Sequence, residues 1–207
     1  MKPSQFVFLA ILLLLLDSCA ETQHFDVLIK NGQIVDGTGK PSYIGDLGIN
    51  ADTIAAVGNL GSATGNIEID ASGLVVAPGF INMLSWATES LIEDGRSMGD
   101  IKQGVTLEVF GEGWSMGPLN EKMKKEEQES QGDIKYKIEW TTLNEYLEYL
   151  TKKGTSPNVA SFVGATTLRI HTVGYEDRAP TPQELDSMKL MVKQAMEEGA
   201  LGVGSSL

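Results

Sequence analysis

The feature of this sequence that most constrains its fold is a change of periodicity close to residue 74. Between residues 25 and 73, short apolar runs alternate with turn signals at a spacing of roughly 8–12 residues, which is typical of a small all-β domain. From residue 74 onward, strand-like runs alternate with helical segments instead. Such repeated strand–helix units predict a parallel sheet or a (β/α) barrel. We therefore expect an α/β chain in which a small β domain comes first.

The first part of the chain contains two expected hairpins. Residues 25–30 form an apolar strand, Asn31-Gly32 is a strong turn signal, and the strand pattern resumes at Gln33. The second hairpin joins residues 46–50 to residues 53–58. Further short strands are expected at residues 67–70 and 74–77.

The second part of the chain contains four expected strands, which begin near Val75, Val105, Val159 and Leu201. Helices are expected over residues 90–103 and 140–153, and a third follows the capping box that Thr181 and Glu184 form around a proline. Residues 122–137 are polar and charged, which predicts a solvated insertion. Because a closed barrel of this kind needs eight strands, we expect the chain to be truncated.

The start of the chain has the pattern of an export signal. Lys2 precedes an apolar run over residues 6–16, which is too short to span a bilayer. Leu16-Asp17-Ser18-Cys19 follows and resembles a bacterial lipoprotein box, in which the cysteine is lipidated. We interpret residues 1–19 as a lipoprotein signal peptide and Cys19 as the lipidation site, with an ordinary signal peptide as the alternative. The expected location is outside the cytoplasm, on a membrane that faces the periplasm or the cell exterior.

Charge and cysteine content exclude two further features. The formal net charge is -12, which argues against a nucleic-acid partner, because such a partner requires clustered Lys and Arg. The sequence has a single cysteine, so no internal disulfide can form.

Five segments carry a resemblance to a known family. They are residues 26–39, 54–58, 69–81, 103–106 and 198–202. In this order they resemble the amidohydrolase superfamily, and the D-aminoacylases (N-acyl-D-amino-acid deacylases) in particular. The resemblance implies a metal-dependent amide hydrolase whose substrate is a small N-acyl amino acid. It also implies a metallo-dependent-hydrolase fold, in which residues 20–73 belong to a small β-sandwich domain and residues 74–207 form the first half of a TIM-like (β/α)8 barrel.

The resemblance also implies zinc as a cofactor, since zinc activates water and polarises the amide carbonyl. Members of the family bind the metal through two histidines after the first barrel strand and a cysteine after the second. This sequence has Leu84, Trp86 and Gly113 at those positions, and none of them offers a zinc ligand. The carboxylate that precedes the histidines is replaced by Asn82. These departures predict that this stretch does not hold the metal in the usual way.

Three residues remain as candidates for the site. Glu112 follows a predicted barrel strand and is a possible metal ligand; the alternative is a solvated side chain in a glycine-rich loop. Arg169 could bind a substrate carboxylate, or form an ion pair on the surface. His171 could contact substrate or metal, although a lone histidine is more often structural. The resemblance implies that the remaining ligands and the catalytic aspartate lie beyond Leu207.

Three interpretations follow. The first is part of a lipid-anchored deacylase-like enzyme, which we expect to be inactive and unstable as this chain alone. The second is a non-catalytic, lipid-anchored binding protein, or pseudoenzyme, because both first-strand histidines are missing. The third is an exported β-rich interaction module, which requires residues 75–207 to lack helices.

Overall fold

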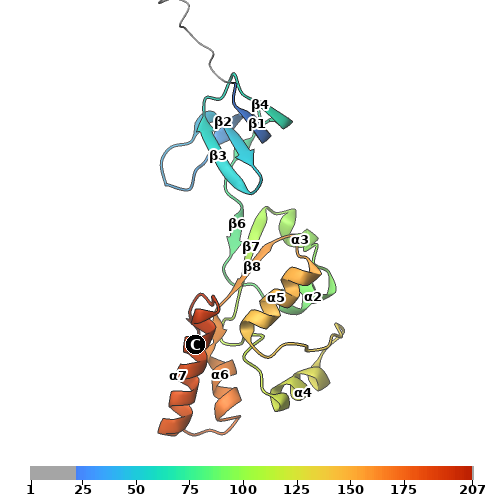
Figure 1. Cartoon of the computed structure of the whole chain (residues 1–207), viewed down its shortest axis with the longest axis vertical. Helices are drawn as coiled ribbons and strands as arrows, with labels where there is room; N and C mark the ends of the chain where they lie inside the picture. The colour runs from blue at the N-terminus through green and yellow to red at the C-terminus, as the bar shows by residue number, and fades with distance from the viewer. Residues whose placement is uncertain (1–21, 207) are drawn as a thin grey trace, which may run out of the picture. The chain divides into compact units, whose positions relative to one another are not determined.

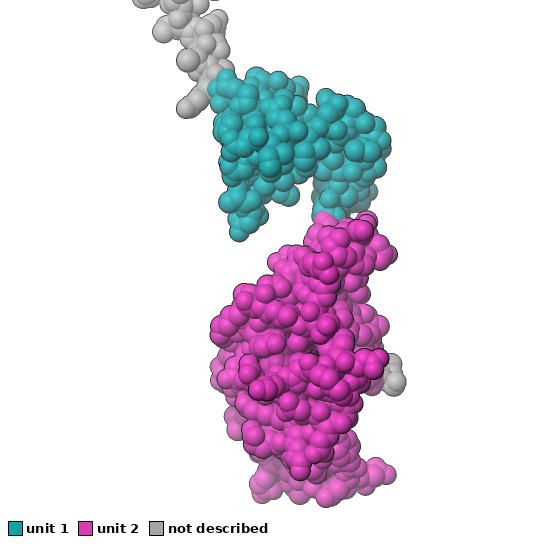
Figure 2. Space-filling model, turned by 90° about the vertical axis from the view of Figure 1, so that its right-hand side faces the viewer, with its two compact units in different colours: residues 1–78 teal, residues 79–207 magenta. Residues whose placement is uncertain are grey.

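The computed structural model describes residues 22–206, and these divide into two compact units between Pro78 and Gly79 (Figure 2). The predicted signal peptide over residues 1–19 and the lipidation site Cys19 lie outside the described residues. The domain boundary expected after Gly73 stays a prediction. The first compact unit extends to Pro78, because Val75 and Val76 pair with β1.

The first unit is one five-stranded sheet. Its strands are β1 (His24–Ile34), β2 (Tyr43–Asn50), β3 (Thr53–Gly58), β4 (Thr64–Asp70) and β5 (Val75–Val76). The order across the sheet is β3-β2-β1-β4, and β5 also pairs with β1. Strand β1 is antiparallel to β2 but parallel to β4 and β5.

The hairpin expected at Asn31-Gly32 is wrong. Strand β1 runs straight through these residues, and the pair produces a register shift instead, with Asn31 in the left-handed region at φ 60°. A side chain at Gly32 would lie 2.5 Å from Cγ2 of Val76, so the glycine admits the close approach of β5. Asn31 does adopt the left-handed conformation of a turn, but the strands that pair with β1 come from later in the chain. The second expected hairpin, β2–β3, is confirmed.

The first unit buries little apolar surface. Its buried apolar cluster consists of Phe25, Leu28 and Ala63. Many large apolar side chains of the unit remain exposed, and they include Ile44, Ile54, Val57, Ile67, Ile69, Leu74 and Val75.

The second unit contains parallel strands that follow chain order. They are β6 (Phe80–Asn82), β7 (Val105–Phe110), β8 (Asn158–Ser161), β9 (Val163–Gly164) and β10 (Val203–Gly204). Strand β7 pairs in parallel with β6 and β8, and β10 pairs in parallel with β9. The expected start near Val75 is wrong, because Val75 belongs to β5 and the parallel sheet begins at Phe80.

Six helices of the second unit accompany these strands (Figure 1). They are α2 (Thr88–Glu93), α3 (Met98–Ile101), α4 (Glu121–Ser130), α5 (Leu143–Lys153), α6 (Ala165–Thr172) and α7 (Pro182–Glu197). Helices α6 and α7 lie side by side. Among residues 22–206, none of the helices is both long and apolar enough to cross a membrane.

The single helix expected over residues 90–103 is wrong, because the chain breaks it into α2 and α3. Ser97 adopts the left-handed conformation at φ 44°. Gly95 passes so close to Gly154 that a side chain on it would lie 2.2 Å from that carbonyl oxygen. The contact with a segment far along the chain therefore decides this break.

Two further corrections concern the stretch over residues 122–137 and the helix α6. Residues 122–137 are not only a solvated insertion, because Met123 on α4 is buried and the ring of Tyr136 stacks on Trp140. Helix α6 was not expected at all. The helices α5 and α7 are confirmed, and each begins with a complete capping box, at Thr142 and Thr181 respectively.

The core of the second unit joins α5 to the strands. Trp140, Tyr146 and Leu150 are almost fully buried in it, together with Phe110 of β7 and Val163 of β9. The Trp140 indole donates a 2.6 Å hydrogen bond to the Met116 carbonyl, which satisfies its polar group inside the core. This core fixes the loop that follows β7.

Candidate functional site

The candidate site lies at the carboxyl ends of β6 and β7, where parallel strand–helix proteins build their active sites. The loop after β6 carries Leu84 and Trp86, and the loop after β7 carries Glu112 and Gly113. The Ser85 amide donates a 2.9 Å hydrogen bond to the Val109 carbonyl, so the two loops are held together. A cavity of about 30 Å³ lies between them, enough for about one water molecule.

The side chains at this cavity offer few polar groups. Leu84 and Trp86 are 50% and 67% exposed, so both side chains reach solvent. Glu112 is exposed and lines the cavity with Trp86 and Trp114. The structure therefore brings Glu112 to the strand ends, next to the positions where the resemblance implies metal ligands.

The loop after β7 is shaped by glycines. Gly111 and Gly113 have φ values of 93° and 73°, which favour glycine. A side chain on Gly111 would lie 2.1 Å from the Phe162 carbonyl oxygen, and one on Gly113 would lie 2.3 Å from Oγ of Ser206. The backbone conformation of Gly113 would therefore strain a cysteine there, and the side chain of Ser206 would have to move to make room for it.

Two buried hydroxyl groups attach the same loop to α6. The Ser115 amide donates a 2.8 Å hydrogen bond to Oγ1 of Thr167, and the Gly164 amide donates a 2.9 Å bond to Oγ of Ser115. The Ser115 hydroxyl in turn donates to the Gly117 carbonyl at 2.6 Å. Ser115 and Thr167 are almost fully buried. Since all their polar groups have partners, their role is to hold the loop in place.

A buried carboxylate beneath the site was missed by sequence reasoning. Glu108 of β7 is 0% exposed, and the Ser85 hydroxyl donates a hydrogen bond to its Oε2. The Ser97 hydroxyl lies 3.0 Å from Oε1 of Glu108 and 3.0 Å from Oδ2 of Asp100. Glu108 therefore ties the loop after β6 to the turn before α3. Its signal in the sequence is a charge inside an otherwise apolar strand.

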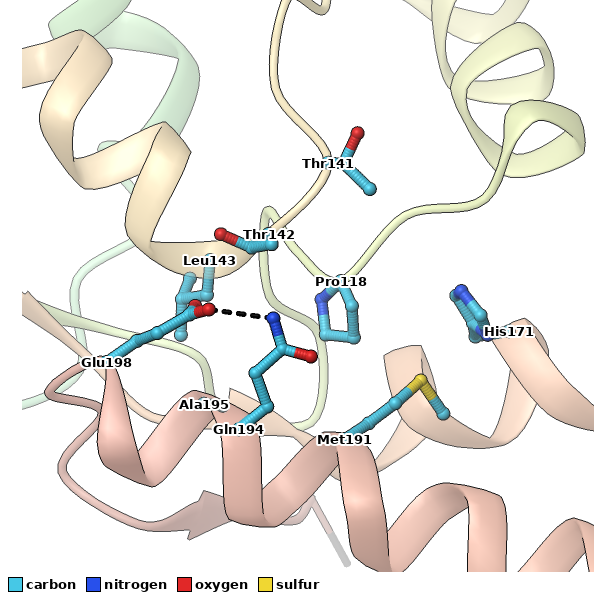
Figure 3. Close-up of a pocket in the computed structure, with 9 residues that line it drawn as sticks. All are labelled: Pro118, Thr141, Thr142, Leu143, His171, Met191, Gln194, Ala195 and Glu198. Carbon is cyan, nitrogen blue, oxygen red and sulfur yellow. Dashed lines mark hydrogen bonds between the residues drawn. The ribbon is translucent and has the colours of Figure 1, made fainter.

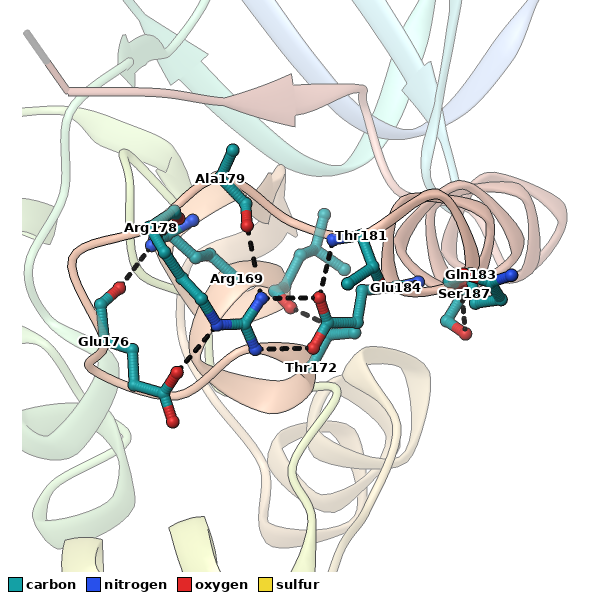
Figure 4. A network of polar contacts seen from close by, with 10 residues as sticks. Arg169, Thr172, Glu176, Arg178, Ala179, Thr181, Gln183, Glu184 and Ser187 are labelled. Atoms are coloured by element: carbon teal, nitrogen blue, oxygen red, sulfur yellow. Dashed lines mark hydrogen bonds and ion pairs between the residues drawn. The ribbon is translucent and has the colours of Figure 1, made fainter.

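Arg169 lies away from the strand ends, in a network with the loop over residues 174–181 (Figure 4). Its Nη2 donates to the carbonyl oxygens of Glu176 and Arg178 at 2.6 and 2.8 Å. The side chain of Arg178 makes a bidentate pair with Glu184, with both N–O distances at 2.7 Å. This guanidinium and the Thr181 cap hold the pKa of Glu184 at about 2. The proposed contact between Arg169 and substrate stays a prediction.

His171 lies near the end of α6 and does not meet Glu112. Its side chain faces a separate cavity of about 280 Å³ between α6, α7 and the loops at residues 118 and 141–143 (Figure 3). Burial lowers the pKa of the His171 imidazole, which favours the neutral form of this ring. The predicted site residues are thus distributed over three places.

The residues at the strand ends do not fit a zinc site by themselves. Across residues 22–206, no three His, Cys, Asp or Glu side chains come together in a way that could hold a metal ion. Only Glu112 at the cavity offers a ligand, and one carboxylate is less than the three protein ligands that a catalytic zinc usually has.

Comparison of the sequence with known proteins found clear relatives. A D-aminoacylase of Alcaligenes xylosoxydans xylosoxydans is 33% identical over 192 residues, which are 91% of this chain and 39% of that protein. An N-acyl-D-aspartate deacylase of the same organism is 31% identical over 87% of this chain and 36% of that protein. The chain thus spans less than two fifths of the length of these relatives. No protein-family model matches it.

Comparison of the structure found proteins of the same kind. A D-aminoacylase described for its binuclear metal center has a TM-score of 0.76 and 31% identity, over 86% of this chain and 38% of that one. An N-acyl-D-glutamate deacylase from Bordetella bronchiseptica, complexed with zinc and a phosphonate inhibitor, has a TM-score of 0.74 and 31% identity over 87% of this chain and 38% of that one.

Proposed function

Because this chain belongs to the D-aminoacylase family of amidohydrolases over the length that it shares with them, we propose that its gene encodes an amide hydrolase that removes the acyl group from N-acyl-D-amino acids. The observation that carries this proposal is the match of about nine tenths of the chain to curated deacylases, in sequence and in fold. The proposed substrate is a small N-acyl amino acid, and the proposed cofactor of the whole protein is zinc.

The proposed architecture is a (β/α)8 barrel with a small β-sandwich. Its support in the second unit is a set of parallel strands that pair in chain order and alternate with helices. Its support in the first unit is the row of exposed apolar side chains, because a single sheet with such a surface gains stability when a second layer covers it. In this arrangement the strand ends with Glu112 form part of the reaction face.

The described residues supply only one part of the chemistry. Glu112 is in position to hold a metal or to contact substrate, and Trp86 and Trp114 form apolar walls beside it. Zinc, when bound by a protein of this family, supplies an activated water and polarises the amide carbonyl. The residues present here do not fit that ion by themselves, so its other ligands would come from other parts of the protein. The 207-residue chain alone is accordingly proposed to be inactive.

The test of this proposal is an assay of the full-length gene product and of the 207-residue chain, with zinc present. N-acetyl-D-leucine, N-acetyl-D-glutamate and their L enantiomers serve as substrates, and released acetate is measured. We expect acetate from a D substrate with the full-length product and none with the 207-residue chain. Turnover by the 207-residue chain would overturn its assignment as inactive.

A change at Glu112 tests the proposed site itself. We expect Glu112→Gln to lower kcat/KM of the full-length product by about tenfold or more, because an amide is a poor substitute for a carboxylate ligand. Glu121→Gln is the matched control, because Glu121 is exposed on α4 and its substitution removes the same charge. Equal activity of the two variants would exclude a role for Glu112.

The second proposal is a non-catalytic binding protein of the same fold. Leu84, Trp86 and Gly113 at the family's ligand positions favour it, and the backbone of Gly113, with φ at 73°, disfavours a cysteine at that position. Metal analysis of the full-length product separates the two proposals. Bound zinc together with turnover supports the enzyme, and the absence of both supports the binding protein.

We also propose that the protein is exported and anchored to a membrane through a lipid on Cys19. The support is the sequence of residues 1–19. Expression with radiolabelled palmitate tests it: the wild-type protein is expected to take up label and a Cys19→Ser variant is not. Label on neither protein would contradict the anchor.

A further inference from the structure

The side chains around the cavity at the strand ends also define the charge of the ligand that fits there. Among residues 22–206, Glu112 is the only charged residue that lines this cavity, and no Lys, Arg or His takes part in the lining. The Glu112 side chain is exposed, and it belongs to none of the side-chain hydrogen bonds or ion pairs formed within those residues. Its carboxylate is therefore available to a ligand, and it attracts a positive charge.

The two indole rings beside Glu112 favour the same charge. Trp86 is largely exposed and Trp114 is half-buried, and both line the cavity. The face of an indole ring attracts a cation within about 6 Å of its centre, more strongly than the rings of Tyr and Phe do. A free carboxylate next to indole rings is thus a combination that recognises an organic cation.

The size and the polarity of the cavity agree with an ammonium group. The volume of about 30 Å³ holds about one water molecule, and an ammonium group is of similar size. The hydroxyl hydrogens of Ser85 and Ser115 are already donated to Glu108 and to the Gly117 carbonyl. Neither hydroxyl group therefore has a hydrogen left for an acceptor on a ligand. A group that brings its own donors fits these surroundings better than a carboxylate does.

In an N-acyl amino acid, only the side chain can carry this positive charge. Acylation converts the α-nitrogen into a neutral amide, and the α-carboxylate is repelled by the charge of Glu112. An acidic side chain would be repelled in the same way. A neutral side chain would leave the carboxylate of Glu112 without a partner.

We propose that the site at the strand ends selects N-acyl-D-amino acids with a positively charged side chain, such as that of lysine. The ammonium group lies beside Glu112, and the methylene groups of the ligand's side chain pack on the exposed ring of Trp86. Charge-assisted hydrogen bonds of this kind are about twice as strong as neutral ones. This inference rests on the proposed function for the acylated part of the ligand. Of the two roles open to Glu112, it assigns contact with the substrate.

The experiment measures binding and turnover separately, with the full-length gene product. N-acetyl-D-lysine is compared with N-acetyl-D-norleucine, whose side chain is of similar length but uncharged, and with N-acetyl-D-glutamate. Calorimetry in the presence of a chelator gives the dissociation constants, and released acetate in the presence of zinc gives kcat/KM. We expect the lysine compound to bind at least about fivefold more tightly than the norleucine compound, and the glutamate compound to bind most weakly. A rise from about 20 to about 500 mM salt is expected to reduce this preference, because salt screens exposed charges.

Variants identify the groups that recognise the cation. Glu112→Gln is expected to bind the lysine and norleucine compounds with equal affinity. Trp86→Leu, which keeps an apolar surface but removes the ring, is expected to weaken binding of the lysine compound about two- to fivefold. Glu121→Gln, which removes an exposed charge from α4, is expected to bind as the wild type does. Glu112 and Trp86 are both exposed, so their variants are expected to fold, and circular dichroism checks this.

The proposed function and the proposed selectivity fail in different ways. If no substrate releases acetate but N-acetyl-D-lysine binds as expected, the hydrolase is wrong and the cation site stands. If acetate is released and the lysine and norleucine compounds bind equally, the cation site is wrong and the hydrolase stands. Two further results would overturn the cation site. One is equal binding of N-acetyl-D-lysine by the Glu112→Gln and Glu121→Gln proteins, and the other is no binding of it up to about 100 mM.

Discussion

At the scale of single residues, the carboxylate of Glu108 connects the parts of the candidate site. It is buried on β7, and the hydroxyl groups of Ser85 and Ser97 are its hydrogen-bond donors. A buried carboxylate without a cation is normally unfavourable. Here each of its two oxygens has a donor, and the two hydrogen bonds hold the loop after β6 and the turn before α3 in place. The position of Trp86, next to Ser85 in the chain, depends on this contact.

The first prediction concerns this carboxylate. We expect Glu108→Ala to lower the free energy of unfolding by about 2–4 kcal/mol, because it leaves a cavity and takes the acceptor from the buried hydroxyl of Ser85 and one of two acceptors from the half-buried hydroxyl of Ser97. Glu108→Gln is expected to cost less than about 1.5 kcal/mol, because its amide can accept from one serine and donate to the other. Urea denaturation measures both values. Equal losses would show that the hydrogen bonds contribute nothing.

At the scale of elements, the helices α4, α5 and α7 of the second unit begin with side-chain caps. Helix α7 starts at a box in which Thr181 and Glu184 bond each other's backbone amides, and Arg178 adds a bidentate ion pair to Glu184. Arg169 holds the preceding loop through two carbonyl oxygens. The start of α7 is therefore determined by local chemistry, and the ion pair makes it sensitive to acid.

The second prediction is the pH dependence of the α7 cap. The pKa of Glu184 is lowered from 4.5 to about 2 in the folded protein, so the carboxylate stabilises the fold above pH 4.5. That contribution is lost as the pH falls through about 2. An NMR titration of the carboxyl carbon is expected to show a midpoint close to 2. In Arg178→Gln the midpoint should rise toward 4.5, and an unchanged midpoint would contradict the role of the ion pair.

The third prediction concerns the cap of α5. Thr142→Ala removes the side chain that accepts from the Glu145 amide, and is expected to lower the free energy of unfolding by about 1 kcal/mol. Thr151→Ala is the control, because Thr151 lies inside the same helix and bonds only the Leu147 carbonyl. Thermal or urea unfolding compares the two. If Thr151→Ala lowers the free energy of unfolding as much as Thr142→Ala does, the cap adds no stability beyond that of a side chain inside the helix.

At the scale of the whole molecule, the described residues expose many large apolar side chains. In the first unit, Ile44, Ile54 and Val75 are 72%, 60% and 62% exposed. In the second unit, Phe80 on β6 is 64% exposed, and Trp86 in the loop after β6 is 67% exposed. These side chains occupy strands and strand ends, where a further layer or further strands would cover them.

The fourth prediction follows from this surface. We expect the 207-residue chain to self-associate as its concentration rises, and to bind a dye that fluoresces on exposed apolar surface. Replacing Ile54 and Ile67 by threonine, which keeps the β propensity, is expected to weaken the association. Sedimentation velocity measures it, and Lys189→Thr, Lys193→Thr serves as an exposed polar control. A monodisperse chain at all concentrations would contradict the prediction.

Much of the fold was predictable because it depends on local chemistry. The capping box at Thr181, the apolar positions Tyr146 and Leu150 of α5, and the glycine after that helix are all visible in the sequence. Asn31-Gly32 misled the prediction, since a left-handed residue serves a register shift as well as a turn. Helix α6 lacks a side-chain cap, which left it without a signal.

The sequence by itself determined the class of the chain, the helices α5 and α7, and the family, because each depends on periodicity and on motifs in a fixed order. It also determined that Leu84, Trp86 and Gly113 cannot hold a metal. Only the tertiary structure decided that Glu112 reaches the strand ends while His171 and Arg169 do not. It alone revealed the partners of Glu108. The reason is physical: side chains that lie far apart in the chain meet only after packing, and the cost of burying a charge arises only there.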